Sequence, residues 1–301
     1  MIDVTLLGTG GMLPKKDRWL ASCLISCGGH SILIDCGEGT QIALKCAQRK
    51  TKPIDLICIT HFHADHISGL PGFLLSMGNE GRTEPVTIAG PEGIEKIVRN
   101  LCIIAPQLPF EIRFADLHDS AGFVSGSLNI NSYKLNHSIE CIGYNFELPR
   151  SGKFDIAKAE KNGIPKSLWS QLQREGRVFS GDKLYTYDMV SSGPRRGIKI
   201  SYCTDTRPCA SIVPAVRDSD LFICEGLYYD DEKFSRTAEK GHMIFREAAG
   251  IAKEAEVKRL WLTHFSPALD NPEDGLEQAR KTFPETYCGY DGMSITLTYH
   301  D

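Results

Sequence analysis

Four side chains of metal-binding type lie within six residues of this chain, directly after the apolar run 56–59. They are His61, His63, Asp65 and His66. His61 and His63 are two residues apart, so in an extended chain their side chains point the same way, whereas a zinc-binding helix carries its histidines four residues apart. Asp65 and His66 come where the chain turns toward a helix-like segment. One loop can therefore present two ligands to one metal ion and two to a second.

A single histidine at the end of a strand is more often a hydrogen-bonded core or surface residue than a metal ligand. A cluster of three imidazoles and a carboxylate is different, because desolvation and mutual repulsion would destabilise it unless a cation compensated. The spacing of this motif therefore favours metal binding.

Other acidic and imidazole side chains stand at the carboxyl ends of predicted strands. They are Asp35, Asp205, Glu225 and His264, and together with His61 of the motif they make five such residues. In open α/β sheets, ligands bind outside the carboxyl ends of the strands. Carboxylates and neutral imidazoles suit zinc, and a shared carboxylate can hold two ions about 3.5–4 Å apart. The pattern predicts a two-metal hydrolytic site at one sheet edge.

Strand and helix patterns alternate along the chain, which indicates an α/β protein. The glycine-rich turn 8–11 lacks the full G-x-G-x-x-G pattern, so it does not indicate a dinucleotide site. The predicted helices are 40–46, 67–77, 242–255 and one that opens at Pro91. The predicted strands are 2–7, 23–27, 31–34, 56–59, 86–89, 112–114, 128–135, 142–148, 198–203, 221–224, 259–263, 286–290 and 294–298.

The composition is that of an ordinary globular protein, with 42% hydrophobic and 24% charged residues in 301. No apolar run approaches the roughly 18 residues that a membrane span needs, and the first residues do not read as a signal peptide. The eleven cysteines are scattered and form no C-x-x-C pair, which indicates buried thiols in a reducing compartment. We expect a cytoplasmic protein without a membrane partner.

Residues 149–197 interrupt the apolar patterns with glycine, proline and many cations. They carry ten basic and five acidic residues, a net charge of +5, whereas the whole chain is at −4 and the rest of it therefore at −9. A charged segment is often only a solvated face. The contrast in sign nevertheless makes a polyanionic partner worth proposing.

Over nearly its whole length the chain resembles the metallo-β-lactamase superfamily and, within it, the ribonuclease Z family, endonucleases that remove the 3′ trailer from precursor tRNA. The H-x-H-x-D-H motif carries the first resemblance, and the segments 35–41 and Asp205-Thr206-Arg207 carry the second. The resemblance implies a single domain over 1–301 with a four-layer αβ/βα sandwich, and a protruding basic arm at 149–197 that serves as a substrate-binding exosite. It also implies a homodimer.

The resemblance implies two Zn²⁺ ions per chain, with Mn²⁺ or Fe²⁺ as possible replacements. The ligands would be His61, His63 and His137 for one ion, Asp65, His66 and His264 for the other, and Asp205 as the bridge. Two further carboxylates would orient histidines, Asp35 a ligand and Glu225 the catalytic His242. On the arm, the cations expected to bind substrate are Lys166, Arg174 and Arg177.

The chain departs from the family at Thr204, where glycine is usual, at Met243-Ile244, where Ser-Thr is usual, and in the glycine-proline-lysine pattern of the arm. The hypothesis for the reaction is in-line attack of metal-activated water on the scissile phosphorus. Asp65 would position that water or accept its proton, and His242 would protonate the leaving 3′ oxygen. The alternatives are a hydrolase of a small phosphodiester, sulfate ester or thioester, which would not need a cationic arm, and a non-catalytic RNA-binding protein.

Overall fold

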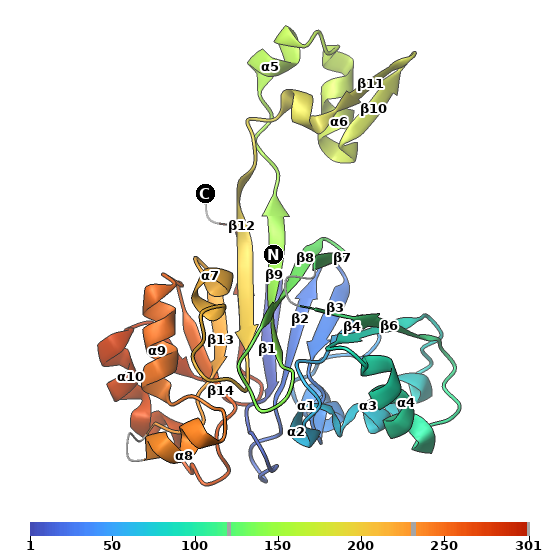
Figure 1. Cartoon of the computed structure of the whole chain (residues 1–301). Helices are drawn as coiled ribbons and strands as arrows, with labels where there is room; N and C mark the ends of the chain where they lie inside the picture. The colour runs from blue at the N-terminus through green and yellow to red at the C-terminus, as the bar shows by residue number, and fades with distance from the viewer. Residues whose placement is uncertain (119–121, 230–232, 300–301) are drawn as a thin grey trace. The chain divides into compact units, whose positions relative to one another are not determined.

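The computed structural model describes residues 1–118, 122–229 and 233–299 (Figure 1). The chain divides into two compact units. The larger comprises residues 1–147 and 199–301, and the smaller runs from Leu148 to Ile198. The larger unit contains two seven-stranded sheets.

The first sheet has the strand order β16-β1-β2-β3-β4-β5-β6. Neighbours are antiparallel from β16 to β3 and parallel from β3 to β6. Its strands are β1 Ile2–Gly8, β2 Ser22–Cys27, β3 His30–Ile34, β4 Ile54–Cys58, β5 Val86–Gly90, β6 Ile112–Asp116 and β16 Ser294–Leu297. The helices α1 Thr40–Cys46, α3 Leu70–Asn79 and α4 Ile94–Leu101 pack with it in one apolar cluster that includes Leu33, Ile57 and Phe73.

The second sheet has the order β15-β14-β13-β12-β9-β8-β7. Its strands are β7 Gly122–Ser125, β8 Leu128–Lys134, β9 Ile142–Arg150, β12 Arg195–Cys203, β13 Leu221–Glu225, β14 Leu260–Thr263 and β15 Thr286–Cys288. From β12 to β15 the strands are parallel. The remaining helices of the larger unit include α7 Ile212–Val216, α8 Phe234–Glu239, α9 Phe245–Glu254 and α10 Leu276–Thr282.

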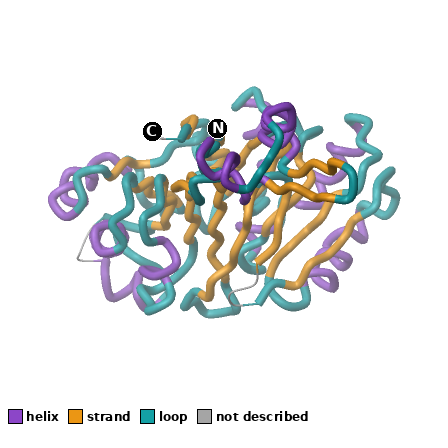
Figure 2. Tube along the Cα trace, turned by 90° about the horizontal axis from the view of Figure 1, so that it is seen from above, coloured by secondary structure: helices purple, strands orange, loops and turns teal. Residues whose placement is uncertain are grey.

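Strands occupy the middle of the larger unit and helices lie outside them (Figures 1 and 2). The four layers are therefore helix, sheet, sheet and helix, which confirms the predicted αβ/βα sandwich. Hydrogen bonds tie the second sheet to the end of β4, because Tyr144 Oη donates to Ile59 O at 2.7 Å and Ile142 N donates to Thr60 O at 3.0 Å. These bonds bring the carboxyl end of β4 against the second sheet.

The smaller unit has a small apolar core of its own, formed by Ala159, Ile164, Leu172, Val178, Tyr185 and Val190. It contains α5 Ile156–Lys161, α6 Trp169–Glu175 and the hairpin of β10 Arg177–Ser180 and β11 Lys183–Thr186. None of these elements was predicted, because the apolar residues of this segment are widely spaced between charged ones.

Some sequence-based boundaries were wrong. The helix expected at 67–77 is split into α2 Ala64–Ile67 and α3, since Gly69 N donates to Cys36 O at the break. The helix expected from His242 begins only at Phe245. Pro91 was expected to open a helix but precedes α4, whose N-cap residue Gly93 has a left-handed backbone conformation.

Within the described residues, no helix is long and apolar enough to cross a membrane. All eleven cysteines are free.

Candidate metal centre

The loop after β4 positions the four donors of the H-x-H-x-D-H motif. The chain stays extended through His63, whose ψ is 148°, and then enters the single turn α2 that carries Asp65 and His66. His61 and His66 are fully buried. The strand-like part thus aims His61 and His63 at one point, and the helical turn aims Asp65 and His66 at another.

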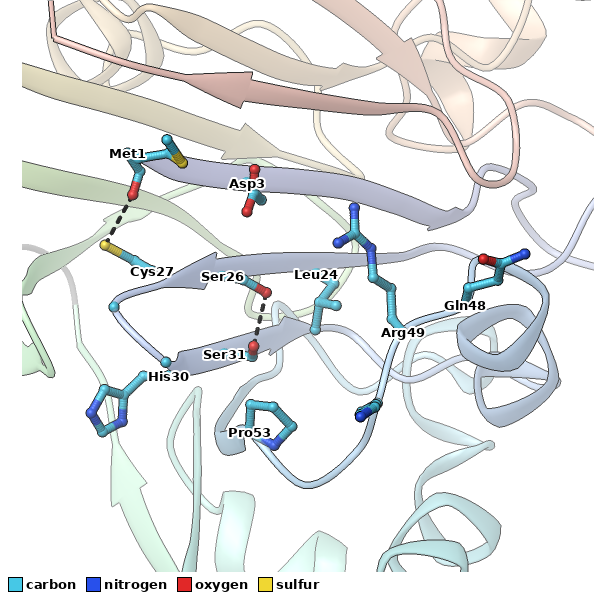
Figure 3. Close-up of a pocket in the computed structure, with 13 residues that line it drawn as sticks. Met1, Asp3, Leu24, Ser26, Cys27, His30, Ser31, Gln48, Arg49 and Pro53 are labelled. Atoms are coloured by element: carbon cyan, nitrogen blue, oxygen red, sulfur yellow. Dashed lines mark hydrogen bonds between the residues drawn. The ribbon is translucent and has the colours of Figure 1, made fainter.

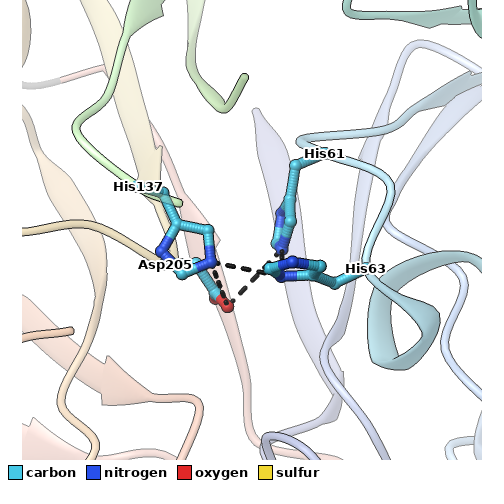
Figure 4. Close-up of side chains that lie close together, drawn as sticks. All are labelled: His61, His63, His137 and Asp205. Carbon is cyan, nitrogen blue, oxygen red and sulfur yellow. Dashed lines mark hydrogen bonds and ion pairs between the residues drawn. The ribbon is translucent and has the colours of Figure 1, made fainter. Parts of the chain in front are cut away.

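Three histidines and one carboxylate converge in the first donor set, which consists of His61, His63, His137 and Asp205 (Figure 4). His63 Nδ1 lies 3.1 Å from both His61 Nε2 and His137 Nε2. Asp205 Oδ2 lies 3.5 Å from His61 Nε2 and 3.8 Å from His137 Nε2. These atoms come from the β4 loop, the segment after β8 and the end of β12.

The second donor set consists of Asp65, His66, Asp205 and His264. Here the other oxygen of Asp205, Oδ1, lies 3.3 Å from His66 Nε2 and 3.2 Å from His264 Nε2. His264 Nε2 lies 3.2 Å from His66 Nε2 and 3.3 Å from Asp65 Oδ2. Asp205 therefore faces one set with each of its two oxygens.

The spacing of the donors fits two tetrahedral ions. Four ligand atoms about 2.0–2.1 Å from a zinc ion lie about 3.3–3.4 Å from one another. The closest donor pairs are separated by 3.1–3.8 Å in the first set and 3.2–3.6 Å in the second, and all donor atoms of a set lie within 4.8 Å of one another. Neutral imidazole and carboxylate donors also suit Zn²⁺ and similar divalent ions. The two sets are compatible with a pair of divalent metal ions.

Partners outside the two sets orient the histidine rings. The buried Asp35 accepts a hydrogen bond from His66 Nδ1 at 2.8 Å, and its other oxygen accepts one from Thr60 N at 2.8 Å. His137 Nδ1 donates to Gly241 O at 3.1 Å. Such partners fix the ring tautomer so that Nε2 points at the metal position. Asp35 and His264 both have positive φ, 56° and 59°, a strained conformation that occurs at functional sites.

His242 belongs to neither of these two sets, but with Glu225 and His264 it forms a third group of possible metal donors. Its Nδ1 is 3.2 Å from Glu225 Oε2, and its ring is stacked on that of His264 with centroids 5.4 Å apart. Burial lowers the pKa of His242, but the Glu225 carboxylate outweighs this effect and raises the pKa to about 9. The Glu225 carboxylate thus favours the cationic form of His242, which is the form that can donate a proton.

The protonation states of the donors follow from burial and neighbouring charges. Burial lowers the pKa of His61 and of His137, so both imidazoles are neutral. Burial would raise the pKa of Asp205, but His264 and His66 hold it well below its ordinary value. Burial acts against a charged His66 too, but the carboxylates of Asp205 and Asp35 raise its pKa. A metal ion would therefore have to displace a proton from His66.

Sequence reasoning missed several residues that contact the site. Met12 N donates to Asp65 Oδ2 at 2.6 Å, and a Cβ on Gly11 would lie 2.5 Å from the His264 ring. Thr204, noted only as a departure from the family, donates to Asp205 Oδ1 at 2.6 Å. Arg207, noted only as part of a signature, binds the carbonyl oxygen of His242. The bond from Thr204 to Asp205 is local, but the contacts of Met12, Gly11 and Arg207 join segments that are distant in sequence and have no local pattern.

The three cations predicted to bind substrate lie on the surface of the smaller unit. Lys166 is 3.7 Å from Glu160 and Arg174 is 2.8 Å from Glu175, and these side chains are well exposed. Exposed pairs of this kind are weak, typically worth 0–1 kcal/mol, so both cations can exchange partners. Arg177 is exposed at the start of the hairpin.

A separate pocket of about 410 Å³ lies around the hairpin of β2 and β3 (Figure 3). It is bordered by the beginning of β3 and by the residues that precede β4, whereas Asp35 and His61 follow the other ends of these two strands. Ser26 Oγ and Ser31 Oγ, 2.8 Å apart, bond to each other. The pocket is thus not part of the metal centre.

Known proteins resemble this chain along its whole length. The chain is 51% identical to ribonuclease Z of Clostridium kluyveri and 49% identical to that of Lachnospira eligens, with 99–100% of each chain covered. The chain belongs to the ribonuclease Z family. Residues 185–265 match the beta-lactamase superfamily domain, and residues 2–103 match the family described as anti-Pycsar protein Apyc1.

Solved structures agree with this family assignment. The crystal structure of the short form of human tRNase Z has a TM-score of 0.69 and 25% identity, covering 99% of this chain and 100% of that one. The metallo-β-lactamase fold protein YhfI from Bacillus subtilis also has a TM-score of 0.69, at 20% identity with 98% of each chain covered, and supports the fold alone. The chain is a metallo-β-lactamase fold hydrolase of the ribonuclease Z family, with a His/Asp cluster suited to divalent metal.

Proposed function

We propose that this chain is a zinc-dependent endoribonuclease that hydrolyses one phosphodiester bond to remove the 3′ trailer of precursor tRNA. The observation that carries the proposal is Asp205, whose two oxygens face two separate donor sets at 3.2–3.8 Å. A carboxylate shared in this way is what a two-metal phosphodiesterase requires. Full-length relatives named ribonuclease Z supply the substrate class.

The first ion would be held by His61, His63 and His137 and the second by Asp65, His66 and His264, with Asp205 shared between them. Mn²⁺ or Fe²⁺ could replace zinc, because imidazole and carboxylate donors bind these ions as well, although with lower affinity. When bound, the two ions supply Lewis-acid charge and lower the pKa of water at the site.

Two residues of the chain handle the protons of the reaction. The Asp65 carboxylate is 12% exposed, compared with 3% for Asp205, so it can contact the attacking water and would position that water or accept its proton. The bond from that water oxygen to phosphorus forms as the bond from phosphorus to the 3′ oxygen breaks. His242, held by Glu225, then donates a proton to the leaving 3′ oxygen.

The smaller unit would act as the exosite for tRNA. Its segment 149–197 has a charge of +5, and RNA helices are bound largely through shape and phosphates rather than through base sequence. Lys166, Arg174 and Arg177 are exposed and would each contact a phosphate. The remainder of the chain would form one catalytic domain that acts in the cytoplasm. We also propose that the protein is a homodimer, and light scattering would test this oligomeric state.

Kinetics with precursor tRNA and with a small chromogenic phosphodiester over a salt series would test the proposal. Replacing Lys166, Arg174 and Arg177 with alanine should weaken tRNA binding. It should also make the negative slope of log affinity against log salt shallower by about 2–3, since each phosphate contact contributes about 0.7–0.9 to its magnitude. Hydrolysis of the small ester should be unchanged, because the metal ligands are intact.

A matched control removes three exposed lysines of the larger unit, Lys45, Lys96 and Lys253. It changes the net charge equally, and we expect the salt slope of the wild type. If the arm variant lost activity on both substrates, the arm would support the active site itself. If it lost activity on neither, the chain would act on a small phosphodiester, sulfate ester or thioester instead.

A further inference from the structure

The guanidinium of Arg207 joins the turn that carries His242 to the beginning of α9. Its Nη1 donates to the carbonyl oxygen of His242 at 2.6 Å and to Glu247 Oε2 at 2.8 Å. Its Nη2 donates to Glu247 Oε1 at 2.5 Å. The side chains of Arg207 and Glu247 are only 21% and 16% exposed, so this fork of hydrogen bonds is partly shielded from water.

His242 needs such support because it lies in no helix or strand. It lies in the turn between α8 and α9, where its N–H donates to Thr237 O at 3.1 Å. The preceding carbonyl, that of Gly241, accepts the bond from His137. The two consecutive carbonyls are therefore held by two different segments, one by the ring of a candidate ligand and the other by Arg207.

Arg207 is itself fixed to the metal centre by its main chain. It follows Asp205 by two residues, and its N–H donates to Asn136 O at 2.9 Å, beside His137. Its guanidinium also lies 5.2 Å from the centroid of the Phe234 ring. On the other side, Glu247 Oε2 accepts from Ile244 N at 3.1 Å and so closes the first turn of α9.

We propose that Arg207 is a positioning residue for proton transfer by His242. This inference rests on the proposed function. The hydrogen bonds of the Arg207 guanidinium go to His242 O and Glu247 and not to the two donor sets. It would hold the main chain of His242 so that the ring, already bound to Glu225, points at the leaving oxygen. Arginine suits this role because its planar fork binds a carboxylate with two nitrogens while one of them also reaches the carbonyl.

The consequence depends on the leaving group. In RNA the electron pair of the breaking bond goes to an alkoxide oxygen, which needs the proton that His242 Nε2 donates. A nitrophenolate is stable without a proton, so its departure does not need His242. Displacing His242 should therefore slow the first reaction and spare the second, whereas general damage to the metal centre would slow both.

The test compares Arg207→Ala with the wild type on precursor tRNA, on a dinucleoside monophosphate and on bis(p-nitrophenyl) phosphate. We expect kcat on the two RNA substrates to fall about 10- to 100-fold, the scale of a small misplacement of a catalytic group. KM, metal content and the nitrophenyl rate should stay within about twofold. Arg207→Lys keeps one donor for the carbonyl of His242 and should recover part of the loss.

Two further variants separate positioning from folding. Since Arg207 acts through His242, Arg207→Ala combined with His242→Ala should be no slower than His242→Ala alone. Glu247→Gln keeps the shape of the contact and should show the same leaving-group pattern with a smaller loss. The proposal is overturned if the two losses multiply, or if all three substrates slow equally.

The failure of this inference and that of the proposed function can be told apart. If the wild type does not cleave precursor tRNA, the proposed function is wrong. The dinucleoside and nitrophenyl esters would then still decide the role of Arg207, because they differ in leaving group and need no tRNA-binding surface.

Discussion

Replacing Gly11 with alanine would place a methyl group against a candidate metal ligand. The added Cβ would lie 2.5 Å from Cε1, 2.6 Å from Nε2 and 2.8 Å from Nδ1 of His264. Ordinary contact between such atoms needs about 3.5 Å, so the His264 ring or the loop must move by about 1 Å. Gly11 does not have positive φ, so alanine would meet no backbone strain. The effect would be purely steric.

Neither movement is available without cost. His264 is fully buried and is held with φ of 59°, and a shift of the loop would break the bond from Met12 N to Asp65. Inserting a methyl group into a packed site costs about 1–3 kcal/mol. For a protein of this length, that should lower the melting temperature of the metal-free protein by about 2–5 °C.

The assay is elemental analysis of metal content together with melting curves with and without a chelator. We expect Gly11→Ala to lose the ion of the second donor set and to keep that of the first, because the added methyl group contacts His264 and not His61 or His63. Gly250→Ala is the matched control. It lies within α9 with nothing within 4 Å of its added Cβ, and should stabilise the protein by about 0.5–1 kcal/mol. Wild-type metal content and melting in Gly11→Ala would refute the close approach of this loop to His264.

Other perturbations of the site should have separable effects. Asp205→Ala should weaken the binding of both ions, because each oxygen of Asp205 faces one donor set. An intact metal pair in this variant would contradict the bridging role of Asp205. Asp35→Asn should lower metal affinity about 10- to 100-fold, because it weakens the hold on His66; titration with zinc would measure this. His242→Ala should keep its metal and slow single-turnover cleavage of RNA about 10²- to 10⁴-fold, and loss of zinc instead would make it a ligand. Chelation should lower the melting temperature of the wild type, because an ion at a thousand times its Kd adds about 4 kcal/mol.

Sequence patterns were sufficient where the signal is local. The H-x-H-x-D-H spacing indicated that the chain changes from an extended segment to a turn after His63. That change directs the four donors of the motif toward two different points. Apolar runs ending in Asp35, Asp205 or His264 correctly marked strand ends. The prediction that they share one sheet edge was wrong, because Asp35 follows β3 of the first sheet whereas Asp205 and His264 follow β12 and β14 of the second. The helix 40–46 was predicted to the residue.

Local signals failed where tertiary contacts override them. Gly69 N bonds to Cys36 O and breaks a helix that periodicity predicted as continuous. The chain before Phe245 is drawn into a turn because His242 is bound on several sides. The helices and hairpin of the smaller unit are short and amphipathic, and their few apolar residues become a core only when packed together.

The residues alone indicated most of the side chains that could hold metal and the loops on which they lie, because donor chemistry and strand periodicity are properties of short segments; His137 was assigned only from the family resemblance. Only the tertiary structure decided that Asp205 faces one donor set with each oxygen, that Gly11 leaves room for the His264 ring, and that Arg207 holds the turn of His242. These contacts join segments that are distant in sequence, and their distances are set by the packing of the two sheets and by steric exclusion. Neither has a signature in the order of the amino acids.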